Sequence, residues 1–118
     1  ISLVKNGVVD SNGQTLTLGG VISGSGSGVG STLTKTGAGT VVLTASNTYT
    51  GSTALNQGVV SVAGSSNLGG GVAGVVFNGG TLAVTGTSTF THPASFTGAG
   101  TYDIASGRTT TWQGSLSG

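Results

Sequence analysis

The stretch LTKTGAGTVVLTASNTYTGSTALNQGVVSV, residues Leu33–Val62, decides the fold. It consists of short runs in which aliphatic and polar residues alternate, and each run ends at Gly or Asn, as β-strands with one buried face do. Its last phrase, Asn56–Val62 (NQGVVSV), recurs 22 residues later as Asn78–Val84 (NGGTLAV). An earlier form, Asn12–Leu18 (NGQTLTL), begins 66 residues before the last one. Recurrence at this spacing predicts a solenoid, in which one structural unit is laid down several times.

Runs of the same kind lie on both sides of this stretch, and no segment sustains the apolar spacing of a helix. Residues 63–74 are expected to form a Gly-rich loop anchored by Leu68. Besides the opening run 1–7, the expected strands are residues 8–10, 15–18, 21–23, 32–36, 40–44, 48–50, 53–55, 59–62, 75–77, 81–85, 88–91, 95–97, 101–104 and 109–112.

Strands this short, joined by Gly and Asn corners, favour an all-β parallel β-helix of about five turns. Each run would pair with the equivalent run one turn on, about 4.8 Å away. A β-sandwich is the alternative, but it needs longer strands and does not explain the repeated phrase.

A longer repeat is also visible in the sequence. Residues 1–10 (ISLVKNGVVD) align with residues 94–103 (ASFTGAGTYD) at an offset of 93, and residues 20–24 align with 114–118 at an offset of 94. We interpret this offset as four turns. Asp10 and Asp103 would then occupy matching positions roughly 19 Å apart, at about 4.8 Å per turn.

The composition excludes several classes of protein. Of the 118 residues, 61 are Gly, Thr or Ser, and the charged residues are Lys5, Asp10, Lys35, Asp103 and Arg108. Three scattered cations do not form a nucleic-acid-binding patch. The abundance of Val, Leu, Ile and Thr argues against disorder. There is no apolar run of about 18 residues that would form a transmembrane helix.

Two further features concern export and stability. Cys is absent, which suits a solenoid stabilised by stacking and is compatible with a chain that crosses a membrane unfolded. The chain begins directly on a strand-like run with no signal-peptide pattern. We expect residues 1–118 to be a single β-helical segment of a longer protein.

The central stretch resembles the passenger-associated transport repeat of bacterial autotransporters, the proteins of type V secretion. The resemblance is carried by LTKTGAGT at 33–40, by Leu43, by NTYTGST at 47–53 and by GVVSV at 58–62. The preceding GVISGSG, residues 20–26, is also typical of the family. The motif positions carried over are Leu33, Lys35, Gly37, Gly39, Thr40, Leu43, Asn47, Tyr49, Gly51 and Gly58.

The resemblance implies a right-handed β-helical passenger, displayed on the surface of a Gram-negative bacterium or secreted from it. The partner implied is the outer-membrane β-barrel translocator of the same polypeptide. In this family the repeat is associated with secretion and passenger folding, and passengers often act in adhesion, aggregation or biofilm formation. Homotypic self-association and a host or cell-surface ligand are the other partners that this reading implies.

An enzyme is the alternative, because β-helices also host polysaccharide lyases and hydrolases. Glycoside hydrolysis usually needs two carboxylates at one site, and Asp10 and Asp103 are expected to lie too far apart and to act as turn residues. His92 precedes Pro93 and is expected at a bend rather than in a Ser-His-Asp triad, since no Gly-x-Ser-x-Gly elbow exists. Gly69–Gly74 fits Gly-x-Gly-x-x-Gly but opens no helix, so we interpret it as a loop. We therefore assign no catalytic residue, cofactor or metal ligand.

Two surfaces were also considered as binding sites. The Thr-x-Thr pairs begin at Thr15, Thr32, Thr48, Thr87 and Thr109, and this spacing is too irregular for one ice-binding ladder. The aromatic residues Tyr49, Phe96, Tyr102 and Trp112 could form a sugar-stacking surface, but core or corner packing is favoured.

Overall fold

The computed structural model describes residues 2–3, 7–24, 32–49, 51–69, 74–98, 100–104, 107, 109–112 and 116–117. Within these residues the chain forms short strands and one 3₁₀ turn. Their bounds are β1 Ser2–Leu3, β2 Gly7–Asp10, β3 Thr15–Leu18, β4 Ser23–Gly24, β5 Leu33–Thr36, β6 Thr40–Leu43, β7 Thr53–Leu55, β8 Val59–Val62, η1 Ser65–Leu68, β9 Val75–Phe77, β10 Thr81–Val84, β11 Ser88–Phe90, β12 Ala94–Phe96, β13 Thr101–Ile104, β14 Thr110–Trp112 and β15 Leu116–Ser117.

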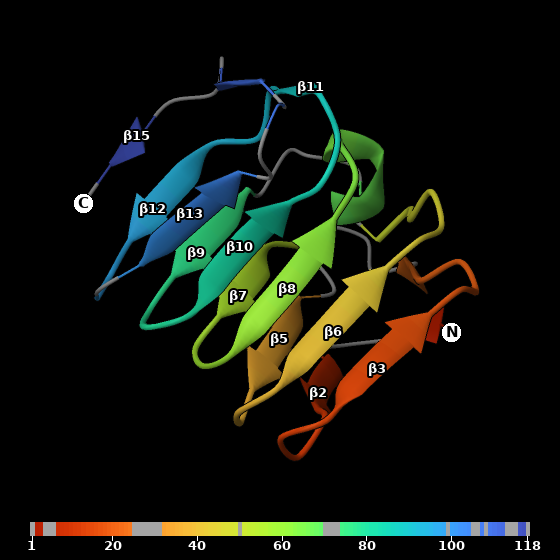
Figure 1. The fold of residues 1–118 in the computed structure, drawn as a ribbon. Helices are drawn as coiled ribbons and strands as arrows, with labels where there is room; N and C mark the ends of the chain where they lie inside the picture. Colours follow the sequence, from red (N-terminus) through yellow and green to blue (C-terminus); the bar gives the residue numbers. More distant parts are fainter. Residues whose placement is uncertain are drawn as a thin grey trace.

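Two long parallel sheets run the length of the molecule (Figure 1). One has the order β15-β12-β9-β7-β5-β2 and the other has the order β13-β10-β8-β6-β3. The pairs β1–β4 and β11–β14 form two small parallel sheets on a third side. Every strand therefore pairs with the equivalent strand of a neighbouring turn, which confirms the expected β-solenoid. Four circuits separate β3 from β13, and five separate β2 from β15.

We name the turns by the first residue of each strand in the six-stranded sheet. Coil 1 begins at Gly7, coil 2 at Leu33, coil 3 at Thr53, coil 4 at Val75 and coil 5 at Ala94, since these residues are in register. The corner between the two long sheets has three or four residues in every coil, whereas the connection across the third side has 9 to 14 in the first four coils. Almost all variation in coil length therefore lies on the third side.

The register explains the repeated phrase. Thr15, Thr40, Val59 and Thr81 are aligned in successive coils of the five-stranded sheet. The 22-residue recurrence is thus one circuit, from coil 3 to coil 4. The 66-residue recurrence is three circuits, although their individual lengths are 25, 19 and 22 residues.

The prediction that the repeat at offset 93 places Asp10 and Asp103 at matching positions was wrong. Asp10 ends β2 in the six-stranded sheet, whereas Asp103 lies in β13 of the five-stranded sheet. Ala94 is in register with Gly7, four circuits and 87 residues away, and not with residue 1. Because coil length varies, a constant offset matched residues of different sheets, and Asp103 lies within β13 instead of the turn expected for it.

Three local expectations also differ from the structure. Residues 46–49 form no strand, and of the expected run at 21–23 only Ser23 lies in a strand, β4. The loop at 63–74 contains η1 rather than irregular chain alone. On this side the backbone bonds partly to side chains, as described below, and partly to backbone carbonyls of neighbouring coils, as the amides of Asn47 and Thr48 do with Ser66 and Ile22. Among the described residues, no helix is long and apolar enough to cross a membrane.

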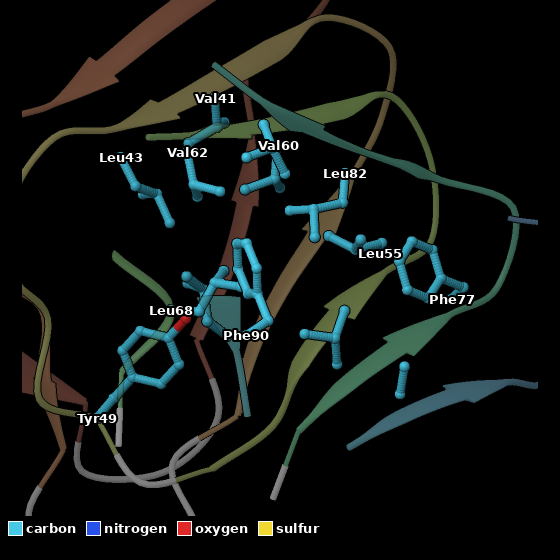
Figure 2. Packing of buried hydrophobic residues seen from close by; sticks show 14 of the residues in the cluster. Val41, Leu43, Tyr49, Leu55, Val60, Val62, Leu68, Phe77, Leu82 and Phe90 are labelled. Carbon is cyan, nitrogen blue, oxygen red and sulfur yellow. The ribbon is translucent and has the colours of Figure 1, made fainter. Parts of the chain in front are cut away.

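The inward residues of successive coils stack into columns (Figure 2). In the five-stranded sheet the buried columns contain Val41, Val60 and Leu82, and Leu43, Val62 and Val84, as the alternation predicts. Leu68 and Phe90 close the core from the third side with exposed fractions of 1% and 0%. At the two ends of the solenoid the inward positions hold exposed apolar residues, with Leu16 at one end and Phe96 and Ile104 at the other.

Candidate functional site

Residues 33–62 occupy coil 2 and the first half of coil 3, where several buried polar side chains sit inside the solenoid. Three of them lie in coil 2 itself: Lys35, Asn47 and Tyr49, with exposed fractions of 2%, 6% and 0%. A buried polar group is costly unless it is hydrogen-bonded. The partners of these groups therefore define what the repeat does in the fold.

Lys35 lies in an inward column between Val9 and Leu55. Its ammonium group turns toward the corner between the two long sheets and donates to the carbonyl oxygens of Thr36, at 2.8 Å, and Gly37, at 2.7 Å. Burial lowers the pKa of Lys35 from its ordinary 10.5, and the carboxylate of Asp10 opposes this shift. The Lys35 side chain therefore stabilises, from inside the solenoid, the corner that follows β5.

The glycines of this corner are required by close approach between coils. Gly58 has φ +70°, and a Cβ there would lie 2.5 Å from the carbonyl oxygen of Gly39 and 2.8 Å from Nζ of Lys35. Gly39 has φ +100°, and a Cβ there would lie 2.5 Å from the carbonyl oxygen of Gln14. Only glycine combines this backbone conformation with such close stacking.

Gln57 bonds coil 3 to coil 2 at the same corner. Its Oε1 accepts from the backbone amide of Gly37 at 2.9 Å and from the hydroxyl of Thr36 at 3.4 Å. The Gly37 amide lies outside the strand ladder, so the Gln57 side chain satisfies a backbone group that the turn leaves over. Gln57 was not among the motif residues predicted from the sequence.

Asn47 joins three consecutive coils on the third side. Its Oδ1 accepts from the amide of Ile22 in coil 1 at 2.7 Å, and its Nδ2 donates to the carbonyl of Asn67 in coil 3 at 2.7 Å. Asn67 continues the pattern: its Nδ2 donates to the carbonyl of Ala45 at 2.8 Å, and its Oδ1 accepts from the amide of Ala63 at 2.9 Å. These two side-chain amides supplement the backbone bonds between the coils where the chain forms no regular strand.

Tyr49 lies next to Leu68 and Phe90 in the core (Figure 2). Its hydroxyl group shares a 2.6 Å hydrogen bond with the hydroxyl of Thr53, whose exposed fraction is 1%. Burial raises the pKa of Tyr49 to about 12, and the bond to Thr53 opposes this shift. The pair connects the third side of coil 2 to the first strand of coil 3.

The remaining motif positions have simpler environments. Leu33 and Leu43 are buried core residues, as the alternation predicted. Thr40 is half-buried, and its amide donates to the carbonyl of Gln14 at 3.0 Å. Gly51 is buried between coils 2 and 3.

Sequence reasoning missed Gln57, Thr53 and Asn67 as partners of motif residues. The available signals were weak: Thr53 follows Tyr49 by four residues, and Asn67 follows Asn47 by 20, close to one coil. Neither spacing distinguishes a partner from a chance polar residue in a chain so rich in Thr and Ser.

The structure does not bring together the acidic residues considered for catalysis. Asp10 and Asp103 lie in coils 1 and 5, on different sheets, so roughly 19 Å of stacking separates their levels at about 4.8 Å per coil. Asp10 accepts from the amide of Asn12 at 2.8 Å, in agreement with its expected turn role. Among the described residues, no three His, Cys, Asp or Glu side chains are grouped as metal ligands.

His92 is buried, with 4% of its surface exposed, and its ring lies 6.1 Å from that of Phe90. Burial lowers the pKa of His92 from 6.5, and the nearby backbone carbonyls of Gly69 and Leu68 oppose this shift. Within the described part of the chain, neither ring nitrogen has a partner in hydrogen-bonding geometry. His92 is therefore a buried bend residue before Pro93 and is not arranged as a general base toward Asp103.

The two candidate binding surfaces are also dispersed by the fold. The Thr-x-Thr pairs fall on all three sides, and among their described residues only Thr89 and Thr111 stack in adjacent strands. Tyr49 is in the core, and Phe96 stacks on Phe77 at 4.6 Å between ring centroids. Tyr102 packs edge-on against Phe90. Parts of these predictions lie outside the described residues, namely Thr50, the side chain of Trp112 and residues 70–73 of the Gly-rich loop.

Comparison with known proteins places this framework in a family. A model of the passenger-associated transport repeat matches residues 33–62. The adhesin BmaC autotransporter of Brucella suis biovar 1 (strain 1330) is 40% identical to this chain over 86 residues. The aligned region is 73% of this chain but only 2% of that relative. No solved structure matches. Residues 33–62 are therefore a passenger-associated transport repeat, and the chain belongs to the autotransporter passengers, which are exposed on the surface of Gram-negative bacteria or secreted from them.

Proposed function

We propose that this chain is a non-enzymatic β-solenoid segment of a longer passenger, and that residues 33–62 help the passenger to fold coil by coil as it is secreted. The outer-membrane translocator of the same polypeptide would be its partner. The observation that carries the proposal is the pair of bonds made by Asn47, which link coil 2 to coil 1 and to coil 3. A side chain that hydrogen-bonds to backbone groups of the coils on both sides allows each folded coil to act as a template for the next.

The other buried polar groups support the same role. Gln57 reaches back from coil 3 to the amide of Gly37 in coil 2. Tyr49 and Thr53 connect the same two coils through the interior. Solenoids are stabilised by contacts between neighbouring units, so folding can propagate along them from one end. Links of this kind would favour stepwise stacking of a chain that emerges from a membrane.

We further propose that the stacked segment serves as a stalk or surface for adhesion, aggregation or biofilm formation. The relative from Brucella suis is named an adhesin, which supports this role. Self-association through the open sheet edges at the solenoid ends is part of the same proposal. Analytical ultracentrifugation tests it: a concentration-dependent increase in mass is expected, and a strictly monomeric chain would contradict it.

The secretion role is tested by changing the core of the repeat in the full-length protein. Val41 and Leu43 have exposed fractions of 2% and 1%, so replacing both by Asp buries two charges and is expected to unfold the central coils. Surface display, measured with an antibody on intact cells, should fall strongly relative to total expression.

Val42 provides the matched control because it lies between the two residues on β6 and faces outward. Val42→Asp introduces the same charge on the same strand and should leave display close to that of the unchanged protein. If the Val41→Asp, Leu43→Asp double variant were displayed normally, the proposed role in folding and secretion would be wrong.

A further inference from the structure

The chain contains three Asn-Gly dipeptides, at Asn6–Gly7, Asn12–Gly13 and Asn78–Gly79. Such a dipeptide is chemically labile, because glycine has no Cβ to hinder its own amide nitrogen from attacking the preceding side-chain amide. The attack requires that the glycine amide give up its proton, and a hydrogen bond from that amide to a carbonyl opposes this.

The backbone bonds distinguish the three dipeptides. The amide of Gly7 donates to the carbonyl of Thr32 at 2.8 Å, and the amide of Gly13 donates to the carbonyl of Ala38 at 2.9 Å. The amide of Gly79 has no acceptor among the residues that the structure describes. Its neighbours on both sides, the amides of residues 78 and 80, donate to the carbonyl of Leu55, so the corner is held while the reactive amide is free.

The side chain of Asn78 is also accessible and unrestrained. Asn78 and Gly79 are both exposed, and no bond to the Asn78 side-chain amide occurs within the described ranges. Beside it in coil 5 lies Gly98, where a Cβ would lie 2.6 Å from Oδ1 of Asn78, so the absence of a side chain at position 98 avoids a clash with the Asn78 amide. Asn47 and Asn67, in contrast, are buried with both side-chain atoms bonded.

We propose that Asn78 is a site of spontaneous deamidation in the folded passenger. The amide nitrogen of Gly79 loses its proton to solvent base and bonds to Cγ of Asn78, and the bond from Cγ to the side-chain nitrogen breaks. Ammonia leaves and a cyclic succinimide remains. Water then opens one of the two ring carbonyls, which gives aspartate or isoaspartate at position 78.

The product changes this corner in two ways. It adds one negative charge to a chain whose formal net charge is +1. The isoaspartate form also adds a methylene group to the main chain between β9 and β10, where the amides of residues 78 and 80 share one acceptor. Long-lived protein at the cell surface would therefore accumulate a form that carries one more negative charge and an altered corner in coil 4.

Trypsin separates the competing sites. Cleavage after Lys5, Lys35 and Arg108 places Asn12 in the peptide 6–35 and Asn78 in the peptide 36–108. The folded chain, with its β-structure verified by circular dichroism, is incubated at mildly alkaline pH, and both peptides are followed by mass spectrometry. Fragmentation assigns the modified residue, and isoaspartyl methyltransferase labelling detects isoaspartate. A parallel sample is incubated unfolded in urea.

We expect Asn78 to react about tenfold faster than Asn12 in the folded chain, the ratio that corresponds to one hydrogen bond, and at a similar rate in urea. Asn78→Gln should remove the modification from peptide 36–108, whereas Asn12→Gln should leave it unchanged. Equal rates at both sites in the folded chain would overturn the proposal. So would a modification of peptide 36–108 that persists in Asn78→Gln.

Discussion

Coils 2 and 4 build the same turn of the solenoid from different interiors. At equivalent inward positions of the six-stranded sheet, coil 2 places Lys35 where coil 4 places Phe77. On the third side, coil 2 buries Asn47 and Tyr49, whose polar atoms bond to neighbouring coils. Coil 4 instead buries the ring of Phe90.

The difference shows that a coil can be held in two ways. Coil 4 depends on apolar area, which is non-directional and tolerates a shift between neighbours. Coil 2 depends on bonds whose geometry fixes the position of coils 1 and 3. The repeat motif therefore marks a turn whose position relative to coils 1 and 3 is fixed by hydrogen bonds.

The largest effect is expected in the apolar coil. Leu82 has an exposed fraction of 0%, and Leu82→Ala should lower the free energy of unfolding by about 3 kcal/mol through lost burial and the remaining cavity. Chemical denaturation measures the loss. Thr81→Ala, on the same strand but facing outward, should cost less than about 1 kcal/mol. Similar losses for the two variants would show that coil 4 is not held by its core.

A smaller loss of stability is expected when the ammonium group of Lys35 in coil 2 is removed. Lys35→Met keeps the length of the side chain but leaves the carbonyls of Thr36 and Gly37 without their donor, at a cost of about 2 kcal/mol. The outward Thr34→Met on the same strand should change stability by less than about 0.5 kcal/mol. A stabilised Lys35→Met would mean that the cost of burying the ammonium exceeds the value of its two bonds.

Tyr49→Phe should cost about 1 kcal/mol, since it removes one hydrogen bond and leaves the Thr53 hydroxyl buried alone. The Tyr49→Phe, Thr53→Val double variant removes both hydroxyl groups and measures their coupling. Because the pKa of Tyr49 is raised from 10.0 to about 12 in the folded chain, its stabilisation is present below pH 10 and is lost as the pH rises toward 12. A purely additive double variant would show that the bond contributes nothing.

The smallest effect is the loss of stability at acid pH that His92 causes. The pKa of His92 is lowered from 6.5 in the folded chain, so the unfolded chain binds a proton more readily. Stability should therefore be complete above pH 6.5 and fall as the pH drops through the folded pKa. Thermal unfolding of His92→Gln across the same range should lack this component, and an identical pH profile in the two proteins would contradict the assignment.

The sequence predicted the solenoid because its two strongest signals are local. Alternation placed Val41, Leu43 and Val60 inside, and the phrase at Asn56 and Asn78 recurred at one coil length. The long-range alignment failed because coil length varies, so the similar sequence around Asp10 and Asp103 did not imply matching positions. The partners of the motif residues could not be predicted, since Gln57 and Asn67 reach across coils whose register depends on the fold.

The uneven connections across the third side have a consequence for what the solenoid can carry. The corners between the long sheets keep three or four residues, while the opposite connections range from 9 to 14 in the first four coils without disturbing the register of either sheet. Lengthening a loop whose ends are already fixed costs little. Foreign epitopes or affinity tags inserted at exposed positions of these connections in successive coils would therefore be presented along a rigid rod at intervals set by the coil spacing.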